Sequence, residues 1–541
     1  MVKTKMSKKE VYSPGIVQIP GLSKFAQESE KKAGCVPPGS GAFAEVFYAG
    51  FSSRESNRDI QAAKSVKEFL GGVGFGFNQR PWLVPTGSLH LPKVVAEQIQ
   101  DRAAILPDLL YLGESLMEIL YGKPLERLGL PSRNVNTSQA NIVRFDDMLT
   151  PDGNLVATEL EGWSSGQGQI TALGYAYHEL MGQYGIATYF PGIDSAAVKA
   201  LRNTFGPNKK IAVIIPHLAN QSGWDFFLQK DFELFAGYCQ NLGLDVVVDQ
   251  PSNLYVDGSV SGKYGKYDVL YPFFPPTGFM DPEVTGSVGA KIVYSWVGGN
   301  VELFPEPSWL QTKMMPLVVL MPHFEPQLTE LLMAKYNTYD RSWAKSYLSK
   351  LKATASMVWG WPLDPESPPV LPGGKRVSWD ELAYKSATYF PDGVVLKPLF
   401  STDCSGLVMP GEMSTAEFAK FMKLKLGSFA GQEPYPTSRT TLVKHDRVGT
   451  NFEIDMRNYM MQAKVPLARC TARYLNNKEN GIKVATGLGA RICTTVFIDK
   501  DGQSHIGDVD ATLRKPDSNA GRIHGATDSL VTIVTFSGYA K

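Results

Sequence analysis

Alternating apolar and polar residues predict a β-hairpin in the segment VRFDDMLTPDGNLVATELEG, which begins at Val143. The PDGN in its middle is a turn signal, with Asp-Gly at the two positions that a tight hairpin turn favours. A reversal there places Asp146 opposite Glu159 and Arg144 opposite Glu161. Because side chains alternate with a period of two, all four then lie on one face of the hairpin.

This charged face has two interpretations. Like charges that oppose each other across two strands repel at about 5 Å, so Asp146 and Glu159 together indicate a cation between them. With Glu161 they form a set of hard oxygen ligands that suits Mg²⁺. A solvated polar face, in which Arg144 and Glu161 form an ordinary cross-strand ion pair, fits the hairpin equally well.

Apolar runs after residue 208 predict an α/β unit. KKIAVII is typical of a buried strand, DFELFAGYCQNLGL of a helix, DVVVD of a second strand, KYDVLYPFF of a third and KIVYSW of a short fourth. Strand, helix and strand in this order imply a parallel sheet with a right-handed crossover. No glycine-rich loop follows the first strand, so a dinucleotide site is not expected there.

Further helices are predicted on both sides of this unit. In VVAEQIQDRAAILPDLLYLGESLMEILYG, the proline at position 107 suggests two helices rather than one. SSGQGQITALGYAYHELMGQYG predicts a helix that opens at Ser164 or Ser165. Residues 304–351 and SWDELAYKSATYF are also helical in pattern, whereas the C-terminal part is β-rich, with a Lys-Asp-Gly turn at 500–502.

Composition narrows the class of protein. The 541 residues are enough for about three or four domains, and 43% hydrophobic content excludes wholesale disorder. The net charge of +1 gives no reason to expect nucleic acid or an anionic membrane as partner. Five scattered cysteines and a basic start without a following apolar run indicate a cytoplasmic protein, and no stretch reaches the roughly 20 apolar residues of a membrane helix.

The segment VVLKPLFSTDCSGLVM resembles a phosphate-binding hairpin. Lys397 at the strand end can reach nucleotide phosphates as a point charge. Ser401, Ser405 and Gly406 would let backbone N–H groups approach phosphate oxygens, although an ordinary hairpin explains the segment too.

Near the C-terminus, SHIGDVDATLRK carries a histidine and two aspartates. His505, Asp508 and Asp510 could form a metal cluster. Alternation into solvent on a β-rich lobe explains them at least as well.

The order of these motifs resembles the circularly permuted ATP-grasp enzymes, of which glutathionylspermidine synthase is a well-known type. RFDDMLTPDGNLVATELEG looks like the family's Arg-x-Asp followed by Glu-x-Asn, and the α/β unit looks like its pre-ATP-grasp domain. WLQTK and VVLKP look like its two nucleotide lysines, and YMMQAKVP like its adenine hinge. The resemblance spans residues from about 140 to 515 through short, collinear motifs.

The resemblance implies an α/β protein, α+β overall, with a circularly permuted ATP-grasp fold. Its parts would be a mostly helical N-terminal supporting region (1–135), the carboxylate hairpin and helix of the permuted core (136–205), a Rossmann-like pre-ATP-grasp domain (206–300), and the ATP-grasp lobes with the nucleotide lysines and hinge (301–541).

It also implies roles for individual residues. Asp146, Glu159 and Glu161 would hold Mg²⁺ ions that bridge ATP phosphates, and Lys313 and Lys397 would contact phosphates. The small-residue loop of Ser401, Ser405 and Gly406 would approach the same phosphates, and the backbone at Met461 and Gln462 would bind adenine. Arg144 would sit beside the metal ions, facing the acyl group or a phosphate, and Arg491 would stabilise charge at the reaction centre. Glu161 departs from the family pattern, which has Asn at this position.

The implied function is an ATP-dependent, ADP-forming carboxylate–amine ligase that makes an amide or peptide bond through an acyl phosphate. Its cofactors would be ATP and Mg²⁺, and its substrates a small carboxylate and an amine, such as an amino acid or small peptide. An ATP-binding phosphotransferase on the same fold, or a non-catalytic ATP-grasp-like binding protein, are the alternatives.

Overall fold

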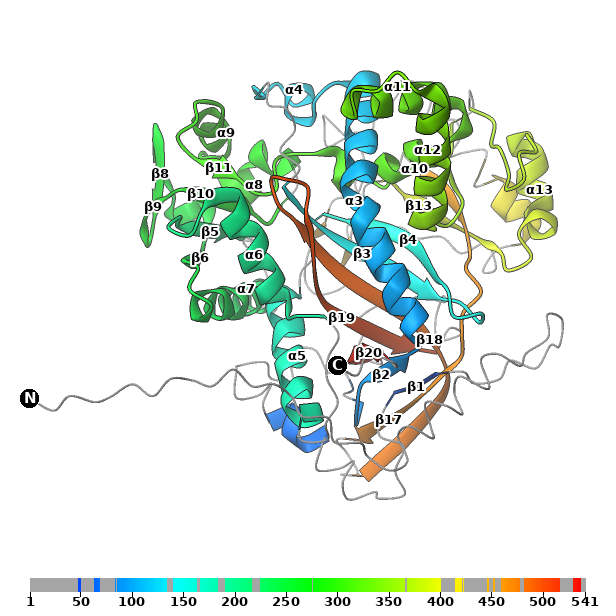
Figure 1. Cartoon of the computed structure of the whole chain (residues 1–541), viewed down its shortest axis with the longest axis horizontal. Coiled ribbons are helices and arrows are strands. Elements are labelled where there is room, and N and C mark those ends of the chain that lie inside the picture. The colour runs from blue at the N-terminus through cyan, green and yellow to red at the C-terminus, as the bar shows by residue number, and fades with distance from the viewer. Residues whose placement is uncertain are drawn as a thin grey trace, which may run out of the picture.

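The computed structural model describes residues 47–49, 63–68, 83, 85–133, 140–162, 166–182, 190–216, 224–274, 276–364, 367–399, 414–420, 422, 445–446, 451–452, 459–476, 481–515 and 529–536. They form a mixed α/β protein in which helices pack on both faces of a large sheet (Figure 1). None of the helices in these ranges is long and apolar enough to cross a membrane.

The large sheet has eight strands in the order β17-β1-β2-β20-β19-β18-β3-β4. Its longest strand, β18, pairs with β17 through its first half and lies between β19 and β3 through its second half, so the sheet curls back on itself. The strands are β1 (Phe47–Ala49), β2 (Leu89–Leu91), β3 (Asn141–Leu149), β4 (Leu155–Glu161), β17 (Cys470–Asn476), β18 (Gly481–Ile498), β19 (Ser504–Arg514) and β20 (Leu530–Phe536).

Strands β3 and β4 form the expected hairpin, but the turn differs from the expected one. The chain reverses over five residues from Thr150 to Asn154 rather than over a two-residue Asp-Gly turn. A bulge between Asp146 and Asp147 then shifts the register by one residue, which restores the pairing of Asp146 with Glu159. Without this bulge, the period of two would turn the charged residues of β4 to the opposite face.

One face of the large sheet packs on α3 (Lys93–Tyr121). Val143, Phe145, Val496 and Ile498 from β3 and β18 share an apolar core with this helix. The expected break at Pro107 is wrong, because α3 runs through it as one helix of 29 residues. Apolar contacts along the helix on both sides of the proline offset the backbone hydrogen bond that proline cannot donate.

The other face packs on α5 (Gln167–Gly182) and α6 (Ile193–Phe205). Ile142 and Phe497 belong to this second core, which the two helices share with the α/β unit. Ser164 and Ser165, where α5 was expected to open, lie outside the described residues.

The α/β unit contains a four-stranded parallel sheet in the order β11-β10-β5-β6. It comprises β5 (Ile211–Ile214), α7 (Trp224–Asn241), β6 (Val246–Asp249), β10 (Val269–Pro272) and β11 (Glu302–Leu303). The expected strand KIVYSW is wrong, because this segment lies in α9 (Gly289–Val297). The buried positions of α9 include Gly289, Ile292, Val293 and Trp296, which follow helical spacing. A window of only six residues is too short to distinguish this spacing from the alternation of a strand.

The helical segment after residue 308 covers the far end of α3 (Figure 1). It consists of η3 (Trp309–Gln311), α10 (Met314–Leu320), α11 (Glu325–Lys335) and α12 (Arg341–Ala355), and it confirms the helical pattern of the sequence. A three-stranded sheet follows in the order β12-β16-β13, with β12 (Gly360–Pro362), α13 (Trp379–Tyr389), β13 (Val394–Pro398) and β16 (Tyr459–Ala463).

The remaining elements are short. They are α4 (Pro124–Arg127), α8 (Pro282–Thr285), β7 (Tyr255–Asp257), β8 (Ser259–Gly262), β9 (Gly265–Tyr267), β14 (His445–Asp446), β15 (Asn451–Phe452), η1 (Pro251–Asn253), η2 (Pro276–Phe279) and η4 (Pro322–Phe324).

Candidate functional site

The site is built on the hairpin face that carries Arg144, Asp146, Glu159 and Glu161, here called the charged face. The register pairs Arg144 with Glu161 and Asp146 with Glu159, as the sequence predicts. This is the face directed away from α3, because the neighbouring residues of β3 pack into the α3 core.

Asp146 lies at the centre of the charged face and is nearly fully buried. Arg144 holds it from one side, with Nε 2.6 Å from Oδ1 and Nη2 3.1 Å from Oδ2. Arg491 on β18 adds a third contact, from Nη1 to Oδ2 at 3.1 Å. Burial alone would raise the pKa of Asp146, but the two guanidinium charges outweigh it and hold the pKa of this carboxyl well below its usual range. Asp146 is therefore ionised at neutral pH.

The two glutamates have basic partners of their own. Glu161 forms an ion pair with Nη2 of Arg144. Glu159 accepts from Lys313, with Oε1 2.9 Å from Nζ. Burial, together with repulsion from Asp146 and Glu159, raises the pKa of Glu161 to about 7 despite the opposing charge of Arg144.

Lys313 reaches this face because the segment before it is anchored on α3. The backbone N–H of Trp309 donates to Oε2 of Glu114 at 2.8 Å, and its indole Nε1 donates to the carbonyl of Gly122 at 3.0 Å. The backbone N–H of Lys313 donates to the carbonyl of Leu399, just past β13, at 3.1 Å. The lysine therefore lies where α3, the hairpin edge and the second sheet meet.

The structure thus brings together six of the residues singled out in the sequence. This charged cluster contains three carboxylates and three cations, drawn from β3, β4, the η3–α10 junction and β18: Arg144, Asp146, Glu159, Glu161, Lys313 and Arg491.

The other predicted nucleotide residues lie on the second sheet. Lys397 is on β13, two residues before Leu399, and is partly exposed. Met461 and Gln462 are on β16, whose backbone is paired along both edges because it is the middle strand. The Gln462 side chain donates to the carbonyl of Thr158 at 2.9 Å, which joins this sheet to the hairpin.

Ser401, Ser405 and Gly406, the predicted phosphate loop, lie outside the described residues.

The three carboxylates match Mg²⁺ in donor type, since ionised oxygen ligands are what this ion prefers. In charge they are already balanced, because each of them pairs with Arg144, Arg491 or Lys313. Within the described ranges, no group of three or more His, Cys, Asp or Glu side chains is arranged as a ready metal cluster. A metal ion here would have to take the place of a basic side chain.

Two further residues lie near the cluster: Cys493, which was missed from the sequence, and Asp510, which was assigned there to a different possible site. Cys493 of β18 pairs with Asp146 on one side and with Asp510 of β19 on the other, so all three share one face. Burial raises the pKa of the Cys493 thiol well above its usual value, so it stays protonated and donates to Asp146. Burial also raises the pKa of Asp510 to about 7, although Arg144 and Arg491 oppose this shift.

Neither interpretation of the SHIGDVD segment is correct. His505, Asp508 and Asp510 are all buried rather than solvated, and they form no metal cluster in the described part of the chain. His505 Nε2 lies 3.0 Å from Oδ2 of Asp499 instead. Apolar residues between the charged ones in DVDATL were the signal for a strand buried on both faces.

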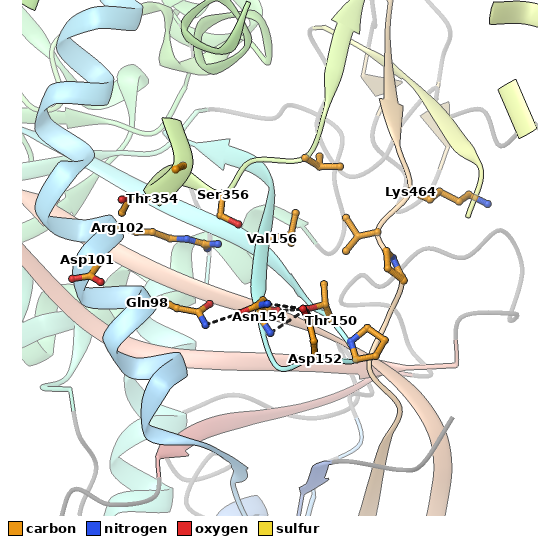
Figure 2. A pocket seen from close by; sticks show the side chains of 15 residues that line it. Gln98, Asp101, Arg102, Thr150, Asp152, Asn154, Val156, Thr354, Ser356 and Lys464 are labelled. Carbon is orange, nitrogen blue, oxygen red and sulfur yellow. Dashed lines mark hydrogen bonds between the residues drawn. The ribbon is translucent and has the colours of Figure 1, made fainter. Parts of the chain in front are cut away.

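A cavity of about 710 Å³ lies beside the hairpin tip, between α3, the end of α12 and the segment after β16 (Figure 2). Gln98 and Arg102 of α3 line one side, and Lys464 follows the predicted hinge strand on the other. Its wall consists of Gln98, Asp101, Arg102, Thr150, Pro151, Asp152, Asn154, Val156, Ala353, Thr354, Ser356, Val358, Lys464, Val465 and Pro466. The cavity is thus built by the hairpin tip and not by the charged cluster.

No protein-family model and no curated protein sequence matches the chain. Among solved structures, a glutathione synthetase-like effector from Globodera pallida in its apo form matches with a TM-score of 0.50 at 10% identity, covering 90% of this chain and 98% of that one. A putative gamma-glutamylcysteine synthetase from Methylobacillus flagellatus has a TM-score of 0.36 at 10% identity, covering 82% of this chain and 88% of that one. The first likeness shows a shared fold, consistent with the ATP-grasp-like fold expected from the motifs.

Proposed function

We propose that the protein is an ATP-dependent carboxylate–amine ligase on a circularly permuted ATP-grasp fold. The observation that carries this proposal is the charged cluster, in which residues 144, 146, 159, 161, 313 and 491 converge on one face. Phosphoryl transfer depends on positioning and on neutralising charge rather than on covalent work by the protein. A compact set of carboxylates, arginines and a lysine meets that need, and the shared fold with a glutathione synthetase-like protein supports it.

In the proposed reaction, a substrate carboxylate attacks the γ-phosphorus of ATP to give an acyl phosphate and ADP. An amine then attacks the acyl carbon, inorganic phosphate leaves, and the amine loses a proton as the amide forms. Mg²⁺, when bound, would neutralise charge on the transferring phosphoryl group, with Asp146, Glu159 and Glu161 as its ligands. Arg144 and Arg491 would stabilise charge at the reacting acyl group, since guanidinium groups suit carboxylates and phosphates.

The nucleotide would lie between the charged face and the second sheet. Lys313 and Lys397 would contact its phosphates, together with the loop of Ser401, Ser405 and Gly406. The predicted contact of adenine with the backbone at Met461 and Gln462 would require one edge of β16 to open, because both edges of this strand are already paired. The contact between Gln462 and Thr158 supports this arrangement, because it holds the β16 strand against the hairpin.

Isothermal titration with a non-hydrolysable ATP analogue, with and without Mg²⁺, tests the proposal. We expect tight binding that depends on Mg²⁺, followed by ADP release when pairs of small acids and amines are screened. Absence of binding in both conditions would rule out the ligase.

A second candidate, a non-catalytic binding protein, is favoured by one observation. Each of the three carboxylates is already paired with a basic side chain, so the face is electrostatically complete without a metal. Such a protein would bind the analogue equally with and without Mg²⁺, or would bind it and release no ADP with any acid–amine pair.

A further inference from the structure

Within the part of the charged cluster that the structure describes, the ion pair of Lys313 and Glu159 joins the hairpin to the η3–α10 segment. The Lys313 side chain is 12% exposed and that of Glu159 is 28% exposed, so the pair is open to solvent on the carboxylate side. The ion pair of Arg102 and Asp147 behind the same hairpin is 3% and 1% exposed. The pair at Glu159 is therefore placed where a ligand can reach it.

The arginine Arg144 and the lysine Lys313 differ in how they can exchange partners. Arg144 grips Asp146 through two nitrogens and also pairs with Glu161, so moving it would break several contacts at once. Lysine carries a compact charge on a flexible four-carbon stem, which can turn to a new partner without moving the backbone. The backbone of Lys313 is itself fixed by its hydrogen bond to Leu399.

We propose that Lys313 is an exchangeable counter-ion for Glu159. In the free protein it neutralises this carboxylate, and when nucleotide binds it moves to a phosphate and releases Glu159 for the metal. This inference rests on the proposed function. It predicts that a free divalent ion binds weakly, because a dication and the lysine ammonium compete for one carboxylate. Metal and nucleotide then bind with positive coupling. The nucleotide phosphate takes Lys313 away from Glu159, and the metal neutralises the carboxylate that is left.

The coupling has a consequence for the protein before nucleotide binds. Without Lys313, the Glu159 carboxylate would lose the charge that neutralises it, and its own negative charge would repel nucleotide phosphates. With Lys313 in place, Glu159 stays paired until phosphates and metal arrive together. The lysine thereby makes the site respond to the metal–nucleotide complex rather than to either component alone.

Binding of Mn²⁺ to the full-length protein without nucleotide tests this inference, using the electron paramagnetic resonance signal of free Mn²⁺. We expect Lys313→Met to bind Mn²⁺ about tenfold more tightly than the wild type, or more, because one competing positive charge is removed. The double variant Lys313→Met with Glu159→Gln should lose this gain. In the wild type, the ATP analogue should raise the affinity for Mn²⁺.

Lys335→Met is the matched control. Lys335 pairs with Asp108 at 2.6 Å with a side-chain exposure of 14%, close to that of Lys313, but that carboxylate lies among tyrosine hydroxyls between α3 and the α11–α12 pair. Its loss should leave Mn²⁺ binding unchanged. Thermal melts of all variants check that they are folded.

The outcomes separate this inference from the proposed function. If Lys313→Met binds Mn²⁺ no more tightly than the wild type while the wild type still binds the ATP analogue, the exchange is wrong and the nucleotide site stands. If the analogue leaves the Mn²⁺ affinity of the wild type unchanged, the coupling is wrong. If the wild type binds no analogue in either metal condition, both the exchange and the ligase are wrong.

Discussion

Each face of the β3–β4 hairpin carries one aspartate, and the two aspartates differ in burial and in partners. Asp146 and Asp147 are neighbours in the chain, yet the strand sends them to opposite faces. Asp147 is paired with Arg102 of α3, which also donates to the carbonyl of Leu155, and the pair is almost fully enclosed. Asp146 lies on the charged face with Arg144 and Arg491, whose side chains remain 15% and 18% exposed.

This difference in exposure separates Asp147, whose charge stabilises the fold, from Asp146, whose charge is available to a ligand. An enclosed carboxylate that is paired with a single cation cannot exchange that partner for a ligand. The role of the pair is therefore to fix α3 against the hairpin. A carboxylate shared by two arginines, beside glutamates and a lysine, lies in a network that can rearrange around a ligand. Sequence neighbours of the same type therefore need not share a role.

The largest effect on stability is expected from Asp147→Asn. It leaves the buried guanidinium of Arg102 without a counter-charge, which costs about 3–5 kcal/mol of unfolding free energy. Asp146→Asn should cost less, because Arg144 keeps Glu161 as partner and both arginines reach solvent. Urea unfolding of the two variants measures the difference, and equal losses would remove the distinction between the faces.

The converse holds for activity. Asp146→Asn and Glu159→Gln should lower Mg·ATP-dependent turnover by about 10²–10³, the range seen when one electrostatic contact to a transition state is removed. Their folds should stay intact, as circular dichroism would show. ADP release in the presence of a productive acid–amine pair is the measurement, and near wild-type turnover in either variant would refute the metal-ligand roles.

The hairpin shows which features of the fold the sequence alone can predict. Its strands and the pairing of Asp146 with Glu159 were predicted, because alternation and a turn signal are local. The pairing is reached through a five-residue turn and a compensating bulge, which the sequence did not reveal. The parallel unit of β5, α7 and β6 was likewise predicted from local periodicity.

Contacts between distant segments could not be predicted in the same way. Arg102 and Asp147 are 45 residues apart, and Arg491 and Asp146 are 345 apart, so no periodicity links them. The six residues KIVYSW fit a strand and a helix equally well, and only packing decides between the two. The burial of Asp510 depends on helices that cover β19, which the strand pattern alone does not record.

A smaller effect on nucleotide binding is expected from Lys397→Ala. Loss of one charged contact to a phosphate should weaken binding of the ATP analogue by about tenfold, within the range for hydrogen bonds to charged groups. Lys420→Ala, at an exposed helical position of the described segment 414–420, is the control and should bind as the wild type does. Titration calorimetry distinguishes them, and an unchanged affinity in Lys397→Ala would remove this lysine from the site.

The last effect concerns stability as a function of pH and centres on Glu114 of α3, which accepts from Trp309 and so anchors the segment that carries Lys313. Burial raises the pKa of Glu114 to about 8, although the Trp309 N–H opposes the shift. From its ordinary pKa near 4.5 up to about 8, the folded protein keeps the proton that the unfolded chain loses. Stability should therefore fall as pH rises through this window, by at most about 1.4 kcal/mol per pH unit from this group.

Glu114→Gln provides the comparison, because glutamine cannot ionise yet its carbonyl can still accept from Trp309. The variant and the wild type should have similar unfolding free energies at pH 4, below the ordinary pKa of the carboxyl. Above this pH the variant should become progressively more stable than the wild type, until the difference levels off above about pH 8. Parallel pH profiles of the two proteins would mean that Glu114 is ionised in the folded state. The segment that carries Lys313 would then be anchored by an ionised carboxylate, as the residues of the charged face are, and not by a neutral carboxyl in the α3 core.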